Sequence, residues 1–195
     1  MKKNLLAFSM IALLAACTAA PEKKVVVMAS GKLTINGDAI KIEPGTTHNE
    51  ATISVKGDKI TVEGFNGAGS FPVTEAGTYL LNLKKDTLIG GYQSFGEAST
   101  REARISQEIL MERMDSLKQL MVGANVSEAR KNNFLAPGQL KKISAMDNAI
   151  LVGPYKGLPA SLEADKDGKV PEVYKFVTNK DARETIGRLE KMLKQ

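Results

Sequence analysis

The residues with the strongest intrinsic chemistry are a single cysteine, Cys17, and a single histidine, His48. Single copies cannot form the His and Cys clusters that hold zinc, a disulfide, or a Cys-x-x-Cys redox site. His48 lies in the polar run from Thr46 to Glu50, which predicts a surface loop rather than a catalytic base. We therefore expect no cofactor and no metal site.

Motifs for hydrolysis and phosphate binding are incomplete. The segment around Ser70 lacks the Gly-x-Ser-x-Gly spacing of a nucleophile elbow, and Ser-x-x-Lys does not occur. The glycine-rich run from Gly64 to Gly69 has no lysine and no following helix, so it predicts a connector.

The acidic candidates also lack a catalytic or calcium-binding pattern. The segment from Asp165 to Gly168 lacks the bidentate glutamate of an EF-hand and predicts a type I turn. Glu108 and Glu112 lie one helical turn apart beside basic residues, which predicts a solvated face. The sequence therefore favours a protein that is not an enzyme.

The N-terminus has the organisation of an export signal. Two lysines follow the first methionine, and residues 5–14 form an apolar run that is too short to span a membrane. The segment Leu14-Ala15-Ala16-Cys17 comes next and resembles a bacterial lipobox. The resemblance implies that residues 1–16 are removed and that Cys17 carries diacylglycerol on its sulfur and an acyl group on its new amine. The alternatives are an ordinary signal peptide and a soluble protein with an apolar first helix.

Localisation and partners follow from this anchor. Stable attachment needs more than one acyl chain, since each buried methylene contributes about 0.8 kcal/mol. By resemblance to enterobacterial sorting, Thr18 favours the outer membrane over the inner one. We expect a cell-envelope protein that is attached to the membrane by its lipid, with an envelope protein as a further partner. The formal net charge of +5 comes from lysines and arginines that alternate with acidic residues, so no nucleic-acid partner is expected.

Residues 28–95 predict a β-rich domain with an internal repeat. Residues 33–43 align with residues 53–63 at a twenty-residue offset. Each copy predicts an antiparallel hairpin, the first with a turn at Asn36-Gly37 and the second with a turn at Gly57-Asp58. Pairing outward from these turns predicts three cross-strand pairs: Leu33 with Ile40, Val55 with Ile60, and Ile53 with Val62. A fainter third copy covers residues 77–83.

Residues 96–195 predict a helical and mixed region. A capping box at Ser99 and Glu102 predicts the start of an amphipathic helix about 35 Å long that ends at Gly123. Its apolar stripe predicts a core contact, with a partner-binding face as the alternative; the stripe consists of Leu110, Met114, Leu117 and Met121.

Shorter elements follow this helix. Ser127 predicts the start of a short helix through Phe134, residues 139–143 and 149–155 have mild strand character, and residues 157–171 predict an exposed loop. Thr178 predicts the cap of a last helix with the apolar stripe Ala182, Ile186, Leu189 and Leu193.

The sequence thus predicts an α+β fold: an N-terminal antiparallel β-hairpin domain, a long amphipathic helix, a small mixed region and a C-terminal helix. Residues 1–16 are the predicted signal peptide, 17–27 a lipidated tether, 28–95 the hairpin domain, and 96–195 a helical and mixed region that packs on the β domain as one unit or stands apart.

The predicted function is that of a membrane-anchored envelope lipoprotein that acts as a non-catalytic binding or assembly module. Alternatives are an envelope enzyme or enzyme accessory that uses carboxylates, and a carbohydrate-binding surface lipoprotein. Besides lipidation at Cys17, Thr87 and Ser116 are candidate modification sites. Both stand in Asp-Ser/Thr-apolar triplets that resemble the O-glycosylation acceptor of Bacteroidota.

Overall fold

The computed structural model describes residues 22–94, 107–166 and 168–194. Of these residues 43% lie in strands and 19% in helices, so the expected helix-rich α+β fold with a long amphipathic helix is wrong and the protein is mostly β. The elements of the described segments are, in chain order, β1 (Lys23–Asn36), β2 (Ala39–Ser54), β3 (Lys59–Glu63), β4 (Gly69–Pro72), β5 (Gly77–Leu83), β6 (Leu88–Tyr92), α1 (Gln107–Met121), β7 (Asn132–Leu135), β8 (Leu140–Ser144), β9 (Ile150–Val152), β10 (Val173–Thr178) and α2 (Asn179–Leu193).

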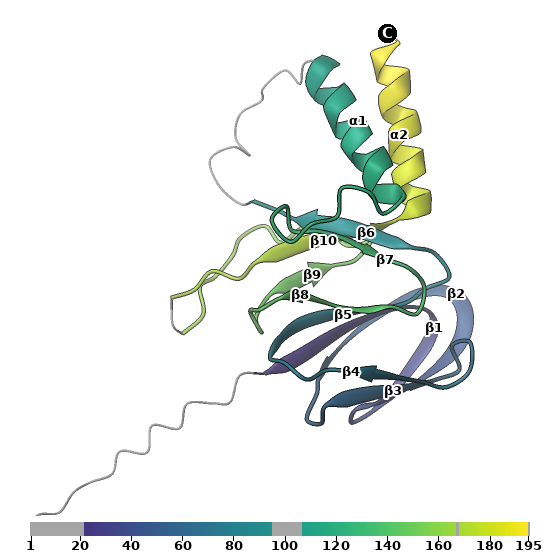
Figure 1. The fold of residues 1–195 in the computed structure, drawn as a ribbon, viewed down its shortest axis with the longest axis vertical. Coiled ribbons are helices and arrows are strands. Elements are labelled where there is room, and N and C mark those ends of the chain that lie inside the picture. The colour runs from purple at the N-terminus through teal and green to yellow at the C-terminus, as the bar shows by residue number, and fades with distance from the viewer. Residues whose placement is uncertain (1–21, 95–106, 167, 195) are drawn as a thin grey trace, which may run out of the picture.

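The strands form two stacked sheets, which we name sheet A and sheet B (Figure 1). Sheet A is nearly closed and has the order β4-β3-β2-β1-β5-β8, and sheet B has the order β7-β6-β10-β9. The sheets do not follow the domain boundary predicted near residue 95. β6 precedes that boundary and β8 follows it, yet each strand belongs to the sheet that the other half of the chain mainly forms. β6 pairs with β7 and β10 in sheet B, whereas β8 pairs with β5 in sheet A. Both sheets are therefore built from both halves of the chain.

The first predicted hairpin is present as β1 and β2, with a register different from the one expected. Leu33 pairs with Ile42 rather than with Ile40, because the two-residue turn consists of Gly37 and Asp38. The pairing differs by two residues, and an even shift keeps each side chain on its expected face. Gly37 has φ +57, a conformation that glycine adopts without steric cost.

A large irregularity bends this hairpin in its middle. Ser30 pairs with His48 while the next residue, Gly31, pairs with Pro44, so residues 45–47 of β2 lie opposite no residue of β1. Gly31 has φ +122, and a Cβ there would lie 2.1 Å from the carbonyl oxygen of Glu43. Only glycine fits this position. The bend, typical of bulged strands, lets sheet A curl.

The second predicted hairpin is wrong. Ile53 pairs with Val25 of β1, and Val62 pairs in parallel with Ile40 of β2. The Gly57 segment instead runs between the two ends of the first hairpin, since the Gly57 amide donates to the Asp38 carboxylate at 2.7 Å and the Gly57 carbonyl accepts from Lys23 Nζ at 2.7 Å. β1 thus pairs with residues 53 and 54, which the predicted second hairpin would have paired locally.

The first part of β1, residues 25–29, and the whole of β5 are buried on both faces and separate two cores. Alternate β1 residues, Val25, Val27 and Ala29, pack inside the curl of sheet A. Val26 and Met28 pack between the sheets with Leu80 of β5 and with the residues Leu88, Leu135, Leu151, Tyr174 and Phe176. Each layer is thus fixed by its own apolar cluster.

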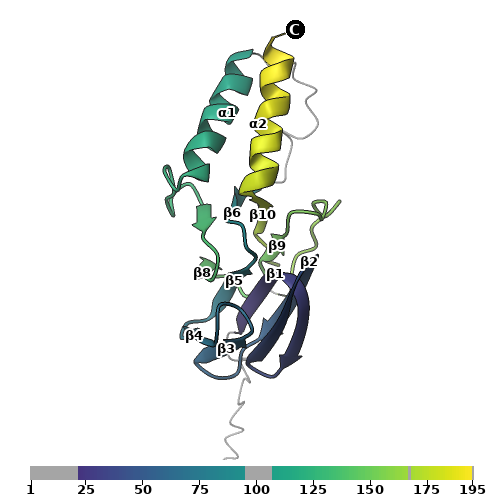
Figure 2. The same cartoon turned by 90° about the vertical axis from the view of Figure 1, so that its right-hand side faces the viewer.

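The two helices pack side by side and stand on the far side of sheet B from sheet A (Figure 2). The predicted cap of α2 is confirmed, because Thr178 and Asp181 form a reciprocal capping box. The predicted end of α1 is also confirmed. Gly123 has φ +75, and its amide and that of Ala124 donate to the carbonyls of Leu120 and Gln119 in a Schellman arrangement.

Two other helix predictions have different outcomes. The capping box expected at Ser99 and Glu102 lies outside the described residues. The short helix expected from Ser127 to Phe134 is wrong, since Ser127 caps only one turn through the Arg130 amide at 3.2 Å and Lys131 then adopts φ +52 before β7 begins.

Within the described ranges, neither helix combines the length and the hydropathy that a membrane span requires.

Candidate functional site

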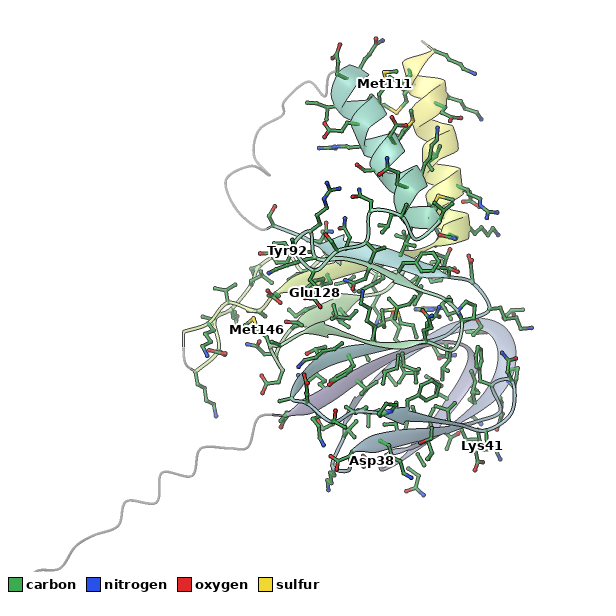
Figure 3. The ribbon with its side chains drawn as sticks, in the orientation of Figure 1. Asp38, Lys41, Tyr92, Met111, Glu128 and Met146 are labelled. Carbon is green, nitrogen blue, oxygen red and sulfur yellow. The ribbon has the colours of Figure 1, made fainter. Side chains whose placement is uncertain are left out.

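A cleft of about 390 Å³ lies beside β7 and β8, which are end strands of sheets B and A. The turn before β7, strand β8 and the start of β10 supply its walls. Figure 3 labels Glu128 and Met146, two of its lining residues, on the same side of the molecule. Because each strand pairs on one side only, the cleft lies at the junction of the two sheets.

Glu172 is the most highly coordinated side chain of the cleft. Its Oε1 lies 2.5 Å from Lys131 Nζ, and its Oε2 accepts from Ser144 Oγ at 2.5 Å and from the Tyr174 hydroxyl at 2.9 Å. Burial by itself would raise the pKa of Glu172, but these three donors outweigh burial and hold the pKa below its usual value. The carboxylate is therefore charged and its charge is compensated inside the protein.

Aromatic rings fix the lysine that compensates it. Lys131 Nζ lies 4.6 Å from the centroid of the Tyr92 ring, and Tyr92 meets Tyr174 edge to face at a centroid distance of 5.8 Å. Burial, together with the bond to Glu172, raises the pKa of the Tyr174 hydroxyl, so it remains a donor. Lys131 thus contacts both the Glu172 carboxylate and the Tyr92 ring, which packs against Tyr174.

Lys141 differs from the other lysines of the cleft. Lys142, its neighbour in β8, pairs with Glu75 at 2.7 Å, and Lys131 pairs with Glu172. Lys141 is half-buried and forms no ion pair with any described residue. Burial lowers the pKa of Lys141, and the opposite charge of Glu128 counteracts part of that effect. The wall of the cleft therefore holds a partly dehydrated lysine that forms no direct ion pair with a described residue.

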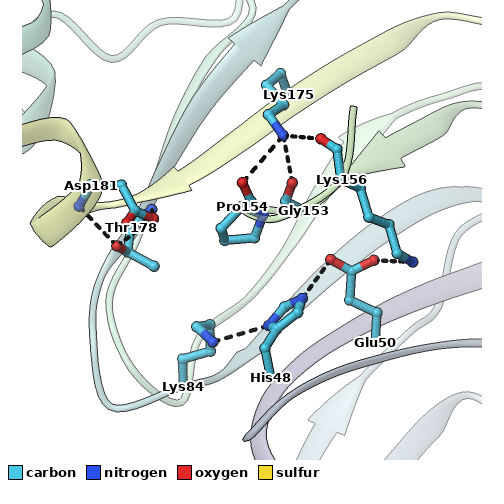
Figure 4. A network of polar contacts seen from close by, with 9 residues as sticks. All are labelled: His48, Glu50, Lys84, Gly153, Pro154, Lys156, Lys175, Thr178 and Asp181. Carbon is cyan, nitrogen blue, oxygen red and sulfur yellow. Dashed lines mark hydrogen bonds and ion pairs between the residues drawn. The ribbon is translucent and has the colours of Figure 1, made fainter. Parts of the chain in front are cut away.

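A second polar cluster joins the two sheets elsewhere (Figure 4). His48 Nε2 lies 2.7 Å from Glu50 Oε1, and His48 Nδ1 lies 3.0 Å from Lys84 Nζ. Glu50 Oε2 lies 2.5 Å from Lys156 Nζ. Lys175 of β10 donates to the carbonyl oxygens of Gly153, at 2.6 Å, and of Lys156. Residues of β2 and β10 are thereby connected with Lys84, which follows β5, and with the loop that follows β9.

The contacts of His48 define what this cluster can do chemically. An ammonium has only donors, so Nδ1 accepts from charged Lys84 and the ring proton resides on Nε2, where it is donated to Glu50. The Tyr155 ring covers the imidazole edge to face at 5.0 Å. Both ring nitrogens are engaged within the protein. We interpret the cluster as a polar connection between the sheets.

The ionisation of the cluster is set by burial and pairing. Burial opposes the charge of Glu50, whose side chain is 6% exposed, but hydrogen bonds from Lys156 and His48 hold its pKa below the usual value. Burial lowers the pKa of Lys84, against the opposing charges of Asp181, Glu50 and Asp86. Hydrogen bonds and nearby opposite charges therefore offset part of the cost of burying these charges.

The candidate modification sites Thr87 and Ser116 are not among the residues of either cluster. Cys17 lies outside the described residues. Thr87 is half-buried before β6, where its amide donates to Asp86 Oδ1 and its carbonyl accepts from the Asn179 amide. Ser116 is exposed in α1. The structure places neither of these hydroxyls in the cleft.

Sequence reasoning missed both clusters. His48, expected in a loop, lies in β2 directly after the bulge. Lys131, Lys141 and Glu172 belong to what the charge pattern predicts as solvated surface. The one local signal is the adjacent pair Lys141-Lys142 in a strand, because successive strand residues face opposite sides and one of two must face inward.

No group of three or more His, Cys, Asp and Glu side chains is arranged to hold a metal ion in residues 22–94, 107–166 and 168–194.

No protein-family model, no curated protein and no solved structure matches the chain.

Proposed function

We propose that this protein is a lipid-anchored lipoprotein of the cell envelope that acts as a non-catalytic binding module, with the cleft beside β7 and β8 as its binding site. The observation that carries the binding role is Lys141, a half-buried lysine on the wall of a cleft of about 390 Å³ that forms no ion pair with a described residue. A cleft of this size is in the range of small-molecule sites. An anionic group of a ligand could form the ion pair that Lys141 lacks.

The anchor is supported by the lipobox that ends at Cys17. The described chain begins at β1 in sheet A, and the cleft lies where sheet A meets sheet B, while the helix pair stands beyond sheet B (Figure 1). This order puts the cleft in the middle of the molecule, beside sheet A, which contains the first described strand.

Metabolic labelling with palmitate tests the anchor. The wild-type protein is expected to incorporate label and to fractionate with membranes, and Cys17→Ser is expected to lose both properties. Ser116→Ala serves as a matched control, because it removes an exposed hydroxyl that is remote from the lipobox. Continued labelling of Cys17→Ser would contradict the lipoprotein assignment.

A further inference from the structure

We propose that the cleft binds a small zwitterion, an amino acid or a short peptide, with the ligand carboxylate on Lys141 and the ligand ammonium on Glu128. This inference rests on the proposed binding function of the cleft and names its ligand class.

The first support is a pair of opposite charges that do not meet. Lys141 and Glu128 both line the cleft, and the charge of Glu128 acts on Lys141. Neither side chain is in an ion pair among the described residues. Two opposite charges that line one cleft without forming an ion pair with each other are complementary to a ligand that carries both charges.

The second support is that the remaining charges of the cleft are already compensated. Lys131 pairs with Glu172, and Lys142 pairs with Glu75. A simple anion would gain the attraction of Lys141 and meet the repulsion of Glu128, and a simple cation would meet the reverse. A zwitterion of matching length gains both attractions.

The third support is polar capacity suited to a peptide group. Asn133 is buried at 5% exposure and lines the cleft, yet its side-chain amide nitrogen has only a long contact of 3.4 Å to the Lys131 carbonyl. Such an amide can donate to a ligand carbonyl and accept from a ligand N–H. The strands beside it, β7 and β8, each lack a pairing partner on one side, and extended peptides pair with strands of this kind.

Size and apolar lining favour small side chains. The cleft volume of about 390 Å³ lies near the lower end of the range of ligand sites. Ile143, Ala145 and Met146 supply apolar contact area on the same walls. We therefore choose alanine and its dipeptide as probes.

The test is isothermal titration calorimetry on the detergent-solubilised, lipidated full chain. L-alanyl-L-alanine and L-alanine are titrated beside N-acetyl-L-alanyl-L-alanine, L-alanyl-L-alanine amide, acetate and methylamine. Saturable binding of the dipeptide or the amino acid is expected, and removal of either terminal charge should weaken it by about tenfold or more, because hydrogen bonds to charged groups are stronger than neutral ones. A dipeptide that binds more tightly than L-alanine identifies a peptide ligand, and equal affinity identifies a free amino acid.

Variants assign the two ends. Lys141→Gln should remove the advantage of a free carboxylate and Glu128→Gln that of a free amine, while Lys41→Gln, on the exposed face of β2, is the matched control with unchanged affinity. Thermal melting of each variant checks folding. Blocked probes that bind as tightly as free ones, or full affinity in folded Lys141→Gln, would overturn the inference. Binding of acetate without binding of the zwitterions would also overturn it and would leave the proposed binding function standing.

Discussion

His48 Nε2 lies 2.7 Å from Glu50 Oε1. Both residues belong to β2, and one residue separates them. Their side chains share a face because strand residues alternate. The bulge at Ser30 and Gly31 lets β2 resume its pairing at His48. A local irregularity of the backbone therefore positions the carboxylate that Lys156 and His48 share.

Glu50→Gln is expected to lower stability in a pH-dependent way. The folded-state pKa of Glu50 lies below its ordinary value of 4.5, so this group contributes stability that is present above pH 4.5 and is lost as the pH falls through the folded-state pKa. Chemical denaturation should show a loss of about 1–3 kcal/mol in the free energy of unfolding at neutral pH, and a smaller loss in acid.

The matched control for this variant is Glu63→Gln, which changes an exposed carboxylate of β3. It should alter the free energy of unfolding by less than about 0.5 kcal/mol. An equal loss for Glu50→Gln at neutral and acid pH would contradict a role for the ionised carboxylate.

Gly153→Ala should disrupt the polar cluster of His48 and Glu50 through a steric clash. A Cβ at residue 153 would lie 1.5 Å from Glu50 Oε1, so the carboxylate must leave its present position. Gly157→Ala, four residues further along the same loop, meets no atom within 4 Å. Differential scanning calorimetry should show a lower melting temperature for Gly153→Ala and an unchanged or higher one for Gly157→Ala. Equal melting temperatures would show that Glu50 moves at no cost.

Leu80→Ala is expected to cost more stability than Leu117→Ala. Leu80 is fully buried between the sheets, where substitutions of this kind cost about 2–5 kcal/mol. Leu117 is only half-buried in α1, where Met114 is the buried residue. Urea denaturation of both variants gives the comparison, and a Leu117→Ala loss as large as that of Leu80→Ala would contradict the exposed character of α1.

Thr178→Ala should weaken the start of α2. The Thr178 hydroxyl oxygen accepts from the Asp181 amide at 3.1 Å, and removal of an N-cap of this type costs about 0.5–2 kcal/mol. Thr185→Ala, inside the same helix, removes a hydroxyl that donates to the Asp181 carbonyl and leaves the cap intact. Hydrogen exchange should show faster exchange in the first turn of α2 for Thr178→Ala alone.

Local chemistry determined several elements from sequence alone. The presence of the first hairpin, though not its register, the end of α1 at Gly123 and the cap at Thr178 each depend on residues within a few positions of one another. A glycine with positive φ or a hydroxyl beside a free amide acts in the same way in any fold. Elements of this kind are predictable because their interactions close within one turn of the chain.

Long-range pairing decided the rest. The second repeat matches the first in residue pattern, yet Ile53 pairs with Val25 and Val62 with Ile40. The continuous apolar run of Val25, Val26, Val27 and Met28 was the available signal for a strand covered on both faces. An apolar pattern fixes which face is buried but leaves the partner open, because any apolar strand of suitable length can cover it.

The sequence by itself predicted the export signal that ends at Cys17 and the shortage of catalytic motifs, which stay predictions, and it determined the end of α1 at Gly123 and the cap of α2 at Thr178. Tertiary structure alone decided that His48 meets Glu50 and that Lys131 pairs with Glu172, while Lys141 forms no ion pair with a described residue. The physical reason is that the ionisation and pairing of a side chain depend on burial and on neighbours from distant strands. Those neighbours are fixed only when the two sheets pack.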